Sequence, residues 1–317
     1  MLTLIFYHHP CPDGKGSSWV AHQYFKSEEH KGLIHYFGVD PSRVKETLFD
    51  PLDDFLDEHP DQNVNVYSLD ISLGIDSYIQ LQENSRVNKF VIIDHHQTGY
   101  KSMLEAFKSE DKLPQNYIFD IEESGCTLTW NFFFPQFPIK PQTLQYIKDR
   151  DIWAWKMPES KAMTEGLGMM LPIGDVGDFT EWDAWMANSE KNLERALTVG
   201  LVMLKKTQDS LPGKVEDGII LKDDTGRQVF VLNTTNLTSE FGNYICQQQD
   251  EAGNWRCDYC LMWRYSYSKK RFYLSLRSNK DRNIDVGEIA KSMNPTGGGH
   301  KCAAGCSLEK LPEWMNI

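Results

Sequence analysis

The chain has 317 residues, 40% of them hydrophobic, and this length favours two domains over one. Its 33 basic and 45 acidic residues give a net charge of −12, which opposes binding along an extended polyanion, so any nucleic-acid substrate should be short. Seven scattered cysteines, no leader-like amino terminus and no bilayer-length apolar run argue against a secreted disulfide scaffold or a membrane protein. We therefore expect a reducing, cytoplasmic setting.

The first predicted strand, Leu2 to Tyr7, leads into a polar segment, His8 to Ser18, after which helical spacing of apolar residues begins at Trp19. We expect this segment to be a strand-to-helix loop. Its glycines and serines are typical of ordinary turns and caps. His9 and Asp13, in contrast, are placed like the reactive residues of a βα unit.

Three further strands follow, and two of them end in acids. After a strand over 33–37, the strand over 64–69 is followed by Asp70. The apolar run 90–93, typical of a strand buried on both faces, is followed by Asp94, His95 and His96. Open α/β sheets bind ligands at the carboxyl ends of their strands, and carboxylate with imidazole suits manganese, iron or zinc. For any one motif alone, a strand capped by a polar turn is the alternative.

Two predicted helices add polar residues to this half of the chain. The helix that opens at Ser124-Gly125-Cys126 has amino-terminal amides of the kind that accept phosphate, although a plain capped helix is an equal alternative. A helix over 143–148 ends in Asp149-Arg150-Asp151, either another acidic cluster of the site or a solvated helix end. The stretch 160–185 has an irregular or short-helical pattern.

An amphipathic helix over 189–211, ended by Pro212-Gly213, is predicted to connect the two domains. Beyond it, strands over 218–221, 228–232, 259–263 and 271–276 and helices over 237–248 and 286–293 predict a smaller α+β domain. The segment from Thr296 to Lys301 predicts a glycine loop whose backbone amides could bind a phosphate, with a flexible surface loop as the alternative. Cys257 and Cys260 lack a second ligand pair at zinc spacing, so we reject a zinc site there.

Taken in order, these motifs resemble the DHH phosphoesterase superfamily in its two-domain form, which includes nanoRNases, cyclic-dinucleotide phosphodiesterases and single-strand DNA exonucleases. The matching segments are Leu-Asp-Ile-Ser, Ile-Asp-His-His, Ser-Gly-Cys-Thr, Asp-Arg-Asp-Ile-Trp and Gly-Gly-Gly-His. The resemblance implies an α/β amino-terminal domain with a mainly parallel sheet flanked by helices, and a smaller α+β domain. We expect the boundaries 1–188, 189–213 for the connecting helix, and 214–317.

The resemblance also implies a role for individual residues. The implied metal ligands are His9, Asp13, Asp70, His95 and Asp149, with Asp70 bridging two ions, while Cys11 stands where the family has a further acid. The implied catalytic residues are Asp94 and His96, with His96 on the substrate side and Asp94 orienting its neighbour. The implied substrate-binding residues are Arg277, Ser278, Gly297, Gly298, Gly299 and His300.

Together with these residues, the resemblance implies a metal-dependent phosphoesterase that hydrolyses phosphodiester bonds of short oligonucleotides or dinucleotides at a two-metal site between the domains. Two Mn²⁺ ions are expected, with Mg²⁺, Co²⁺ or Fe²⁺ as alternatives. No membrane and no long duplex is expected as a partner, and the oligomeric state stays open. The alternatives are a phosphomonoesterase for a small nucleotide such as a bisphosphorylated adenosine, or a nucleotide-binding protein with weak or no catalysis.

Overall fold

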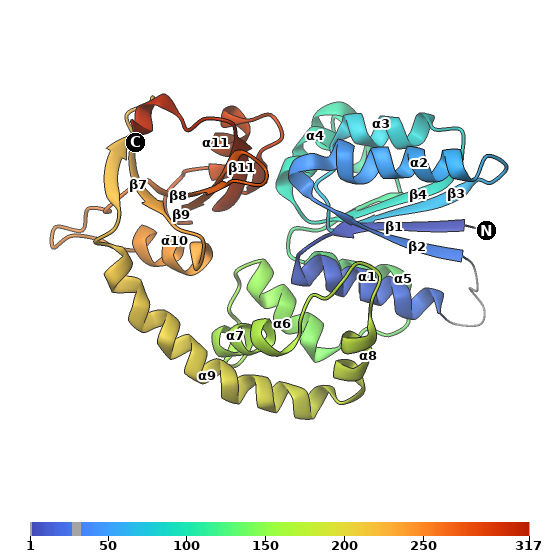
Figure 1. The fold of residues 1–317 in the computed structure, drawn as a ribbon, viewed down its shortest axis with the longest axis horizontal. Helices are drawn as coiled ribbons and strands as arrows, with labels where there is room; N and C mark the ends of the chain where they lie inside the picture. Colours follow the sequence, from blue (N-terminus) through green and yellow to red (C-terminus); the bar gives the residue numbers. More distant parts are fainter. Residues whose placement is uncertain (1, 27–32, 317) are drawn as a thin grey trace. The chain divides into compact units, whose positions relative to one another are not determined.

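The computed structural model describes residues 2–26 and 33–316 (Figure 1). It divides into two compact units, Met1–Leu204 and Lys205–Ile317, and each is described by itself. Among the described residues, no helix combines the length and the apolar character needed to cross a membrane.

The first unit is built on a five-stranded sheet in the order β2-β1-β3-β4-β5, in which every pair is parallel. This confirms the predicted α/β class with a parallel sheet. The strands are β1 Leu2–His8, β2 Leu33–Val39, β3 Val64–Leu69, β4 Val87–Asp94 and β5 Tyr117–Phe119. The helices are α1 Pro12–Phe25, α2 Asp50–Glu58, α3 Ile75–Glu83, α4 Gln97–Phe107, α5 Gly125–Phe133, α6 Gln142–Asp151, α7 Ser160–Met170 and α8 Thr180–Ala187.

Helices cover both faces of this sheet, and the strands alternate their side chains between the two layers (Figure 1). In β4, Val91 and Ile93 pack into the layer that contains α1 and α5, while Phe90 and Ile92 pack toward α2, α3 and α4. The strand is therefore buried on both faces, as its apolar run predicts, and its polar end lies at the sheet's carboxyl edge.

Helix α1 begins earlier than we predicted. Only residues 9–11 are outside regular structure, because the helix starts at Pro12, a residue whose fixed φ suits the first helical position, and already includes the predicted loop residues up to Ser18. The glycines inside it serve close packing. A Cβ on Gly14 would lie 2.1 Å from the His8 carbonyl oxygen, so only glycine lets this turn of α1 rest on the end of β1.

Helix α9, Ser189–Lys214, runs past the Pro212-Gly213 end that we predicted. The amides of Val215 and Glu216 bond the carbonyls of Pro212 and Gly213, so a tight final turn completes the helix beyond the proline. The helix covers the predicted connecting segment.

The second unit holds a six-stranded sheet in the order β10-β11-β9-β8-β7-β6, antiparallel except for the parallel β7–β8 pair. Its core lies in two layers, one with α11 and one with α10. The strands are β6 Ile219–Lys222, β7 Gln228–Asn233, β8 Tyr259–Ser266, β9 Arg271–Ser278, β10 Gly298–His300 and β11 Ala303–Leu308. The helices are α10 Thr238–Cys246 and α11 Val286–Met293.

The prediction of a glycine loop over 296–301 is wrong in part. Gly298–His300 forms strand β10, which pairs with Ala303–Gly305 of β11. Small residues on both strands allow this pairing, and a Cβ on Gly299 would lie 2.6 Å from the Ala303 carbonyl oxygen. Part of the glycine backbone is therefore engaged in a sheet.

Candidate metal centre

Acids and histidines from three strand ends gather at the carboxyl edge of the first unit's sheet. Strand β1 ends at His8, β3 is followed by Asp70, and β4 ends in Asp94 and is followed by His95 and His96. Because the three strands are neighbours and parallel, their ends meet at one edge.

Asp70 lies at the centre of this cluster and is buried. Its Oδ2 atom is 3.2 Å from His8 Nδ1, and its Oδ1 atom is 3.2 Å from His95 Nε2 and 3.9 Å from His96 Nδ1. Burial raises the pKa of Asp70, but hydrogen bonding to His8 and His95 and the charges of His8 and His96 outweigh it, so the pKa lies well below its usual value. Asp70 is therefore held as a carboxylate.

The backbone of Asp70 is in the left-handed region, with φ of 60°. Non-glycine residues seldom adopt this conformation, which is enriched at ligand-binding and active sites. In this conformation the side chain contacts His8 and His95.

Asp13 approaches from α1 and is held by the start of α5. Its carboxylate accepts hydrogen bonds from the amides of Gly125 at 2.6 Å and Cys126 at 3.0 Å, and from Ser124 Oγ at 2.8 Å. The helix start that we considered for substrate phosphate thus binds a carboxylate of the protein itself. Burial raises the pKa of Asp13 to about 7, and the charges of Asp70 and Asp151 add to the rise.

Gly125 brings these groups together. A Cβ at this position would lie 2.6 Å from the Cβ of Asp70. No larger residue fits without moving α5 or Asp70, so the glycine permits the amide that holds Asp13 to lie against Asp70.

His95 connects three acids. Its Nε2 atom is 3.2 Å from Asp70 Oδ1, 3.2 Å from Asp151 Oδ2 and 3.7 Å from Asp13 Oδ2. Burial alone would lower the pKa of His95, but the three acids reverse this and raise it to about 10. The three acids that stabilise the proton on His95 would also stabilise a metal cation at this place.

His96 is paired with Asp94 through a short contact, 2.7 Å between Nδ1 and Oδ1. Burial lowers the pKa of His96, but the nearby Asp94 charge raises it more, so its pKa lies above the usual value. The other Asp94 oxygen, Oδ2, is buried without a hydrogen-bond partner within the described part of the chain. A buried carboxylate oxygen without a donor favours a nearby cation.

Three overlapping groups at this edge have the chemistry and spacing of metal ligands. Each group brings its ligand atoms within 4.8 Å of one another, and Asp70 belongs to two groups. The groups are His8, Cys11 and Asp70; Asp13, His95 and Asp151; and Asp70, Asp94 and His96. Carboxylate oxygens with imidazoles suit divalent manganese, iron or zinc, so the residues fit such ions.

Two predicted ligands lie elsewhere. His8, not His9, reaches Asp70, because β1 runs to His8 and ends beside β3. The amide of His9 bonds the Val39 carbonyl, and its ring contacts Tyr7 edge-on. Burial lowers the pKa of His9, and Lys15 and His8 lower it further, so it is not held as a cation.

Asp149 is also outside these groups, and Asp151, which we did not predict, is inside them. The Asp149 carboxylate accepts the amides of Lys156 at 2.8 Å and Met157 at 3.2 Å. Residues two apart on a helix lie about 200° apart around its axis, so only one of the two acids at the end of α6 can face the histidines. The sequence motif contains both acids and does not distinguish them.

The predicted substrate residues of the second unit lie on β9 and β10, except Gly297, which precedes β10. Arg277 donates from Nη2 to Ser239 Oγ at 2.8 Å and from Nη1 to the Leu276 carbonyl at 2.8 Å. Ser278 donates to the Ile284 carbonyl at 3.0 Å, which ties down the segment before α11. His300 pairs with Ala303, which also pairs with Arg277. Arg277 and His300 therefore belong to nearby strands of one sheet.

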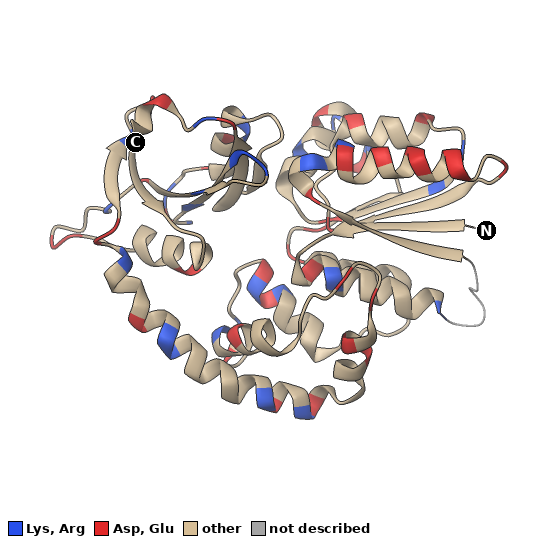
Figure 2. Cartoon of the chain, in the orientation of Figure 1, with Lys and Arg blue, Asp and Glu red and all other residues tan. Residues whose placement is uncertain are grey.

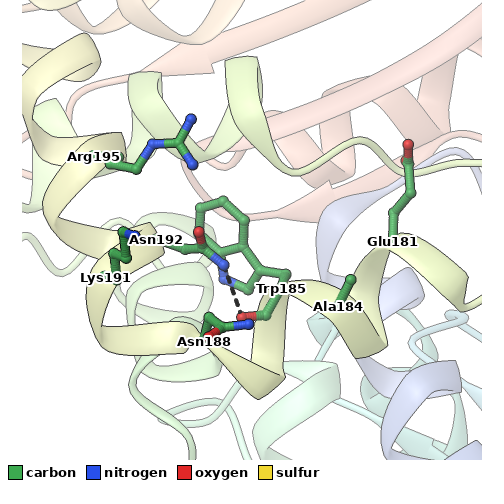
Figure 3. A pocket seen from close by; sticks show the side chains of 7 residues that line it. All are labelled: Glu181, Ala184, Trp185, Asn188, Lys191, Asn192 and Arg195. Carbon is green, nitrogen blue, oxygen red and sulfur yellow. Dashed lines mark hydrogen bonds between the residues drawn. The ribbon is translucent and has the colours of Figure 1, made fainter.

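Two cavities of the first unit are lined mainly by residues other than the predicted site residues, and Asp149 is the predicted residue in their linings. One, of about 420 Å³, is lined by residues of α8 and α9, with Trp185 at its base (Figure 3). The other, of about 430 Å³, is lined by Asp149 and by three lysines, Lys140, Lys148 and Lys156, among other residues. Glu123 is 3.0 Å from Lys148 and 3.8 Å from Lys140, so part of this positive charge is already paired.

No protein-family model matches the chain. Uncharacterized protein R106 of Acanthamoeba polyphaga mimivirus is 30% identical over 316 residues, which cover 98% of this chain and 68% of that protein. Among solved structures, the DHH domain of a member of a ribosomal-protein family is similar with a TM-score of 0.59 and 12% identity, covering 97% of this chain and 83% of that chain. This likeness shows the fold.

A pGpG-specific phosphodiesterase, PggH from Vibrio cholerae, is similar with a TM-score of 0.42 and 12% identity, over 97% of this chain and 93% of that chain. At that TM-score the likeness says nothing about the activity of this chain.

Proposed function

The chain belongs to the same protein family as the mimivirus protein and has the fold of a DHH domain, and from its acid–histidine cluster we propose that it is a metal-dependent phosphoesterase. The observation that carries this proposal is the overlap of ligand groups at Asp70, which offers one oxygen toward His8 and the other toward His95. A carboxylate shared in this way suits two neighbouring divalent ions.

His8, Asp13, Asp70, His95 and Asp151 would hold the ions, with Asp70 between them. Manganese is our first choice, because imidazole and carboxylate ligands occur together here. Divalent ions at such a site polarise a phosphoryl oxygen and make water a nucleophile at neutral pH.

The protein's own residues prepare the site in three ways. The amides of Gly125 and Cys126 fix the Asp13 carboxylate, and the left-handed backbone of Asp70 fixes the central acid. Asp94 accepts from His96 Nδ1, which orients the imidazole and leaves Nε2 as the atom that can carry a proton to a leaving oxygen. His96 is 19% exposed and can thus meet a substrate at the surface of the cluster.

The substrate that we propose is a phosphodiester of a short oligonucleotide or dinucleotide. The acid surface of the first unit supports a short substrate. Helix α2 carries five acids within nine residues, and Figure 2 shows acids along it. Such a surface repels a long polyanion. Arg277 and His300 are proposed to bind substrate phosphate, because arginine can bind phosphate through two nitrogens.

The experiment that tests this function is a hydrolysis screen with Mn²⁺ and with EDTA, on labelled dinucleotides, on five-residue oligonucleotides and on a nucleoside bisphosphate. We expect Mn²⁺-dependent cleavage of the dinucleotide or the five-residue chain. Cleavage of the bisphosphate alone would show that the activity is that of a phosphomonoesterase and not of a phosphodiesterase. Tight nucleotide binding without cleavage of any of the three would contradict an enzyme.

A further inference from the structure

Two tryptophans follow the metal cluster on a loop that Asp149 holds in place. The Asp149 carbonyl accepts the amides of Ala154 and Trp155, and its carboxylate accepts those of the next two residues, 156 and 157. Trp153 and Trp155 both have left-handed backbones, with φ of 57° and 53°. Large side chains rarely adopt this conformation, and it persists only where the surrounding structure enforces it.

The two indoles form an aromatic surface with cations beside it. Their centroids are 4.8 Å apart with the planes 74° to each other. The Arg150 guanidinium lies 4.4 Å from the centroid of Trp153 and 5.8 Å from that of Trp155, and Lys161 Nζ lies 5.6 Å from that of Trp155. Each contact is of the cation–π kind, so positive charge is held at the ring surface.

These tryptophans differ from those that build the core. Trp182 and Trp185 are 2% and 6% exposed, and their indole nitrogens donate to the Pro172 carbonyl and to Thr143. Trp153 and Trp155 are only partly buried and belong to no core cluster of the described chain. Packing of the core therefore does not account for two tryptophans with left-handed backbones at this place.

The pair follows the metal cluster closely along the chain. Trp153 is two residues beyond Asp151, so their Cα atoms are at most about 7 Å apart. Asp151 is itself 3.2 Å from His95 in the cluster. The loop that carries the two indoles therefore begins beside the cluster.

We propose that Trp153 and Trp155 form a stacking surface for a nucleobase next to the scissile phosphate. The proposal rests on the proposed phosphoesterase function and narrows it, because the substrate must then carry an aromatic base. Pyrophosphate and polyphosphate have nothing to stack. Base–indole stacking tolerates any of the bases, so the surface would select nucleotides without selecting sequence.

The test compares Trp153→Leu and Trp155→Leu with Trp153→Phe and Trp155→Phe on two substrates, a labelled dinucleotide and the same backbone with abasic sugars. We expect the leucine variants to lower kcat/KM on the dinucleotide roughly five- to hundredfold, the range for loss of one base–aromatic stack. On the abasic substrate we expect less than about a twofold change. The phenylalanine variants should retain most of the dinucleotide activity because they keep a ring.

A binding measurement keeps the test independent of turnover. With EDTA present, the dinucleotide should quench the fluorescence of the wild-type protein, and both phenylalanine variants should bind with a weaker quench. Trp255→Leu, which changes a partly buried tryptophan of the second unit, serves as the control and should leave both readouts unchanged.

Equal losses on the dinucleotide and the abasic substrate would overturn the stacking surface while leaving the phosphoesterase intact. If the wild type cleaves neither substrate, the proposed function fails and binding decides the inference. Dinucleotide affinity that falls in the leucine variants supports it. Unchanged affinity, or no binding by the wild type, overturns it.

Discussion

Asp149 and Asp151 stand two positions apart at the end of α6, and their carboxylates have different partners. Asp151 lies 3.2 Å from His95, whereas Asp149 bonds two backbone amides of the following loop. Asp151 is therefore placed to bind a cation, whereas Asp149 holds the backbone of the loop. The same contrast separates His8, which contacts Asp70, from His9, which does not.

This contrast predicts opposite effects of two matched substitutions. Asp151→Asn should lower both the affinity for Mn²⁺ and the turnover. Loss of a residue that only supports a metal ligand typically costs roughly 10- to 100-fold, and we expect a larger loss here because Asp151 is itself a proposed ligand. Asp149→Asn should keep the metal but lower the free energy of unfolding by about 1–3 kcal/mol, since the amides of Lys156 and Met157 lose a charged acceptor. Metal analysis and thermal unfolding check both. Loss of metal in Asp149→Asn with full retention in Asp151→Asn would reverse the assignment.

At the scale of elements, the packing of α5 against β3 depends on Gly125. Its missing Cβ lets the helix start lie against Asp70 while the Gly125 amide binds Asp13. A side chain here moves either the helix or the central acid. The site is therefore sensitive to a residue that is neither an acid nor a histidine.

Gly125→Ala should accordingly reduce Mn²⁺ binding and turnover by at least about tenfold, because it displaces the groups that hold the metal ligands in place. Gly168→Ala is the matched control, because nothing lies within 4 Å of a Cβ at that position of α7. Alanine there should raise the free energy of unfolding by about 0.5–1 kcal/mol and leave turnover unchanged. Normal metal binding in Gly125→Ala would show that α5 can shift without disturbing Asp70.

The sequence predicts the strand ends well, because parallel neighbours bring their carboxyl ends to one edge whatever the exact bounds. Asp70, Asp94 and His95 meet there for that reason. Whether His8 or His9, and Asp149 or Asp151, faces the cluster depends on the phase at which a strand or helix ends. One residue of error in a strand reverses a side chain's direction, and no residue type in the motif signals it.

For the whole molecule, the cluster makes stability depend on pH. Without metal, the pKa of His95 is raised from 6.5 to about 10, so the stability it adds is fully present below pH 6.5 and is lost as the pH rises through about 10. The pKa of Asp13 is raised from 3.8 to about 7, so the stability that its proton adds is likewise lost as the pH rises between those values. Stability of the metal-free protein should therefore fall as the pH rises above neutrality.

Metal binding should oppose this trend, because an ion at the cluster displaces these protons and binds more tightly at higher pH. Thermal unfolding with EDTA and with Mn²⁺, across the range from pH 6.5 to about 10, should show a shift in Tm that grows with pH. His95→Gln should flatten the fall seen with EDTA. A shift that shrinks as the pH rises would contradict a metal in the place of these protons.

The most direct measurement is the number of Mn²⁺ ions bound by the wild-type protein and by Asp70→Ala, with dinucleotide hydrolysis followed in the same samples. Asp54→Asn, an exposed acid of α2, is the control and should match the wild type. The central position of Asp70 predicts two ions and turnover in the wild type, and at most one ion without turnover in Asp70→Ala. Two ions with normal turnover in Asp70→Ala, or no bound ion in the wild type, would contradict the metal centre.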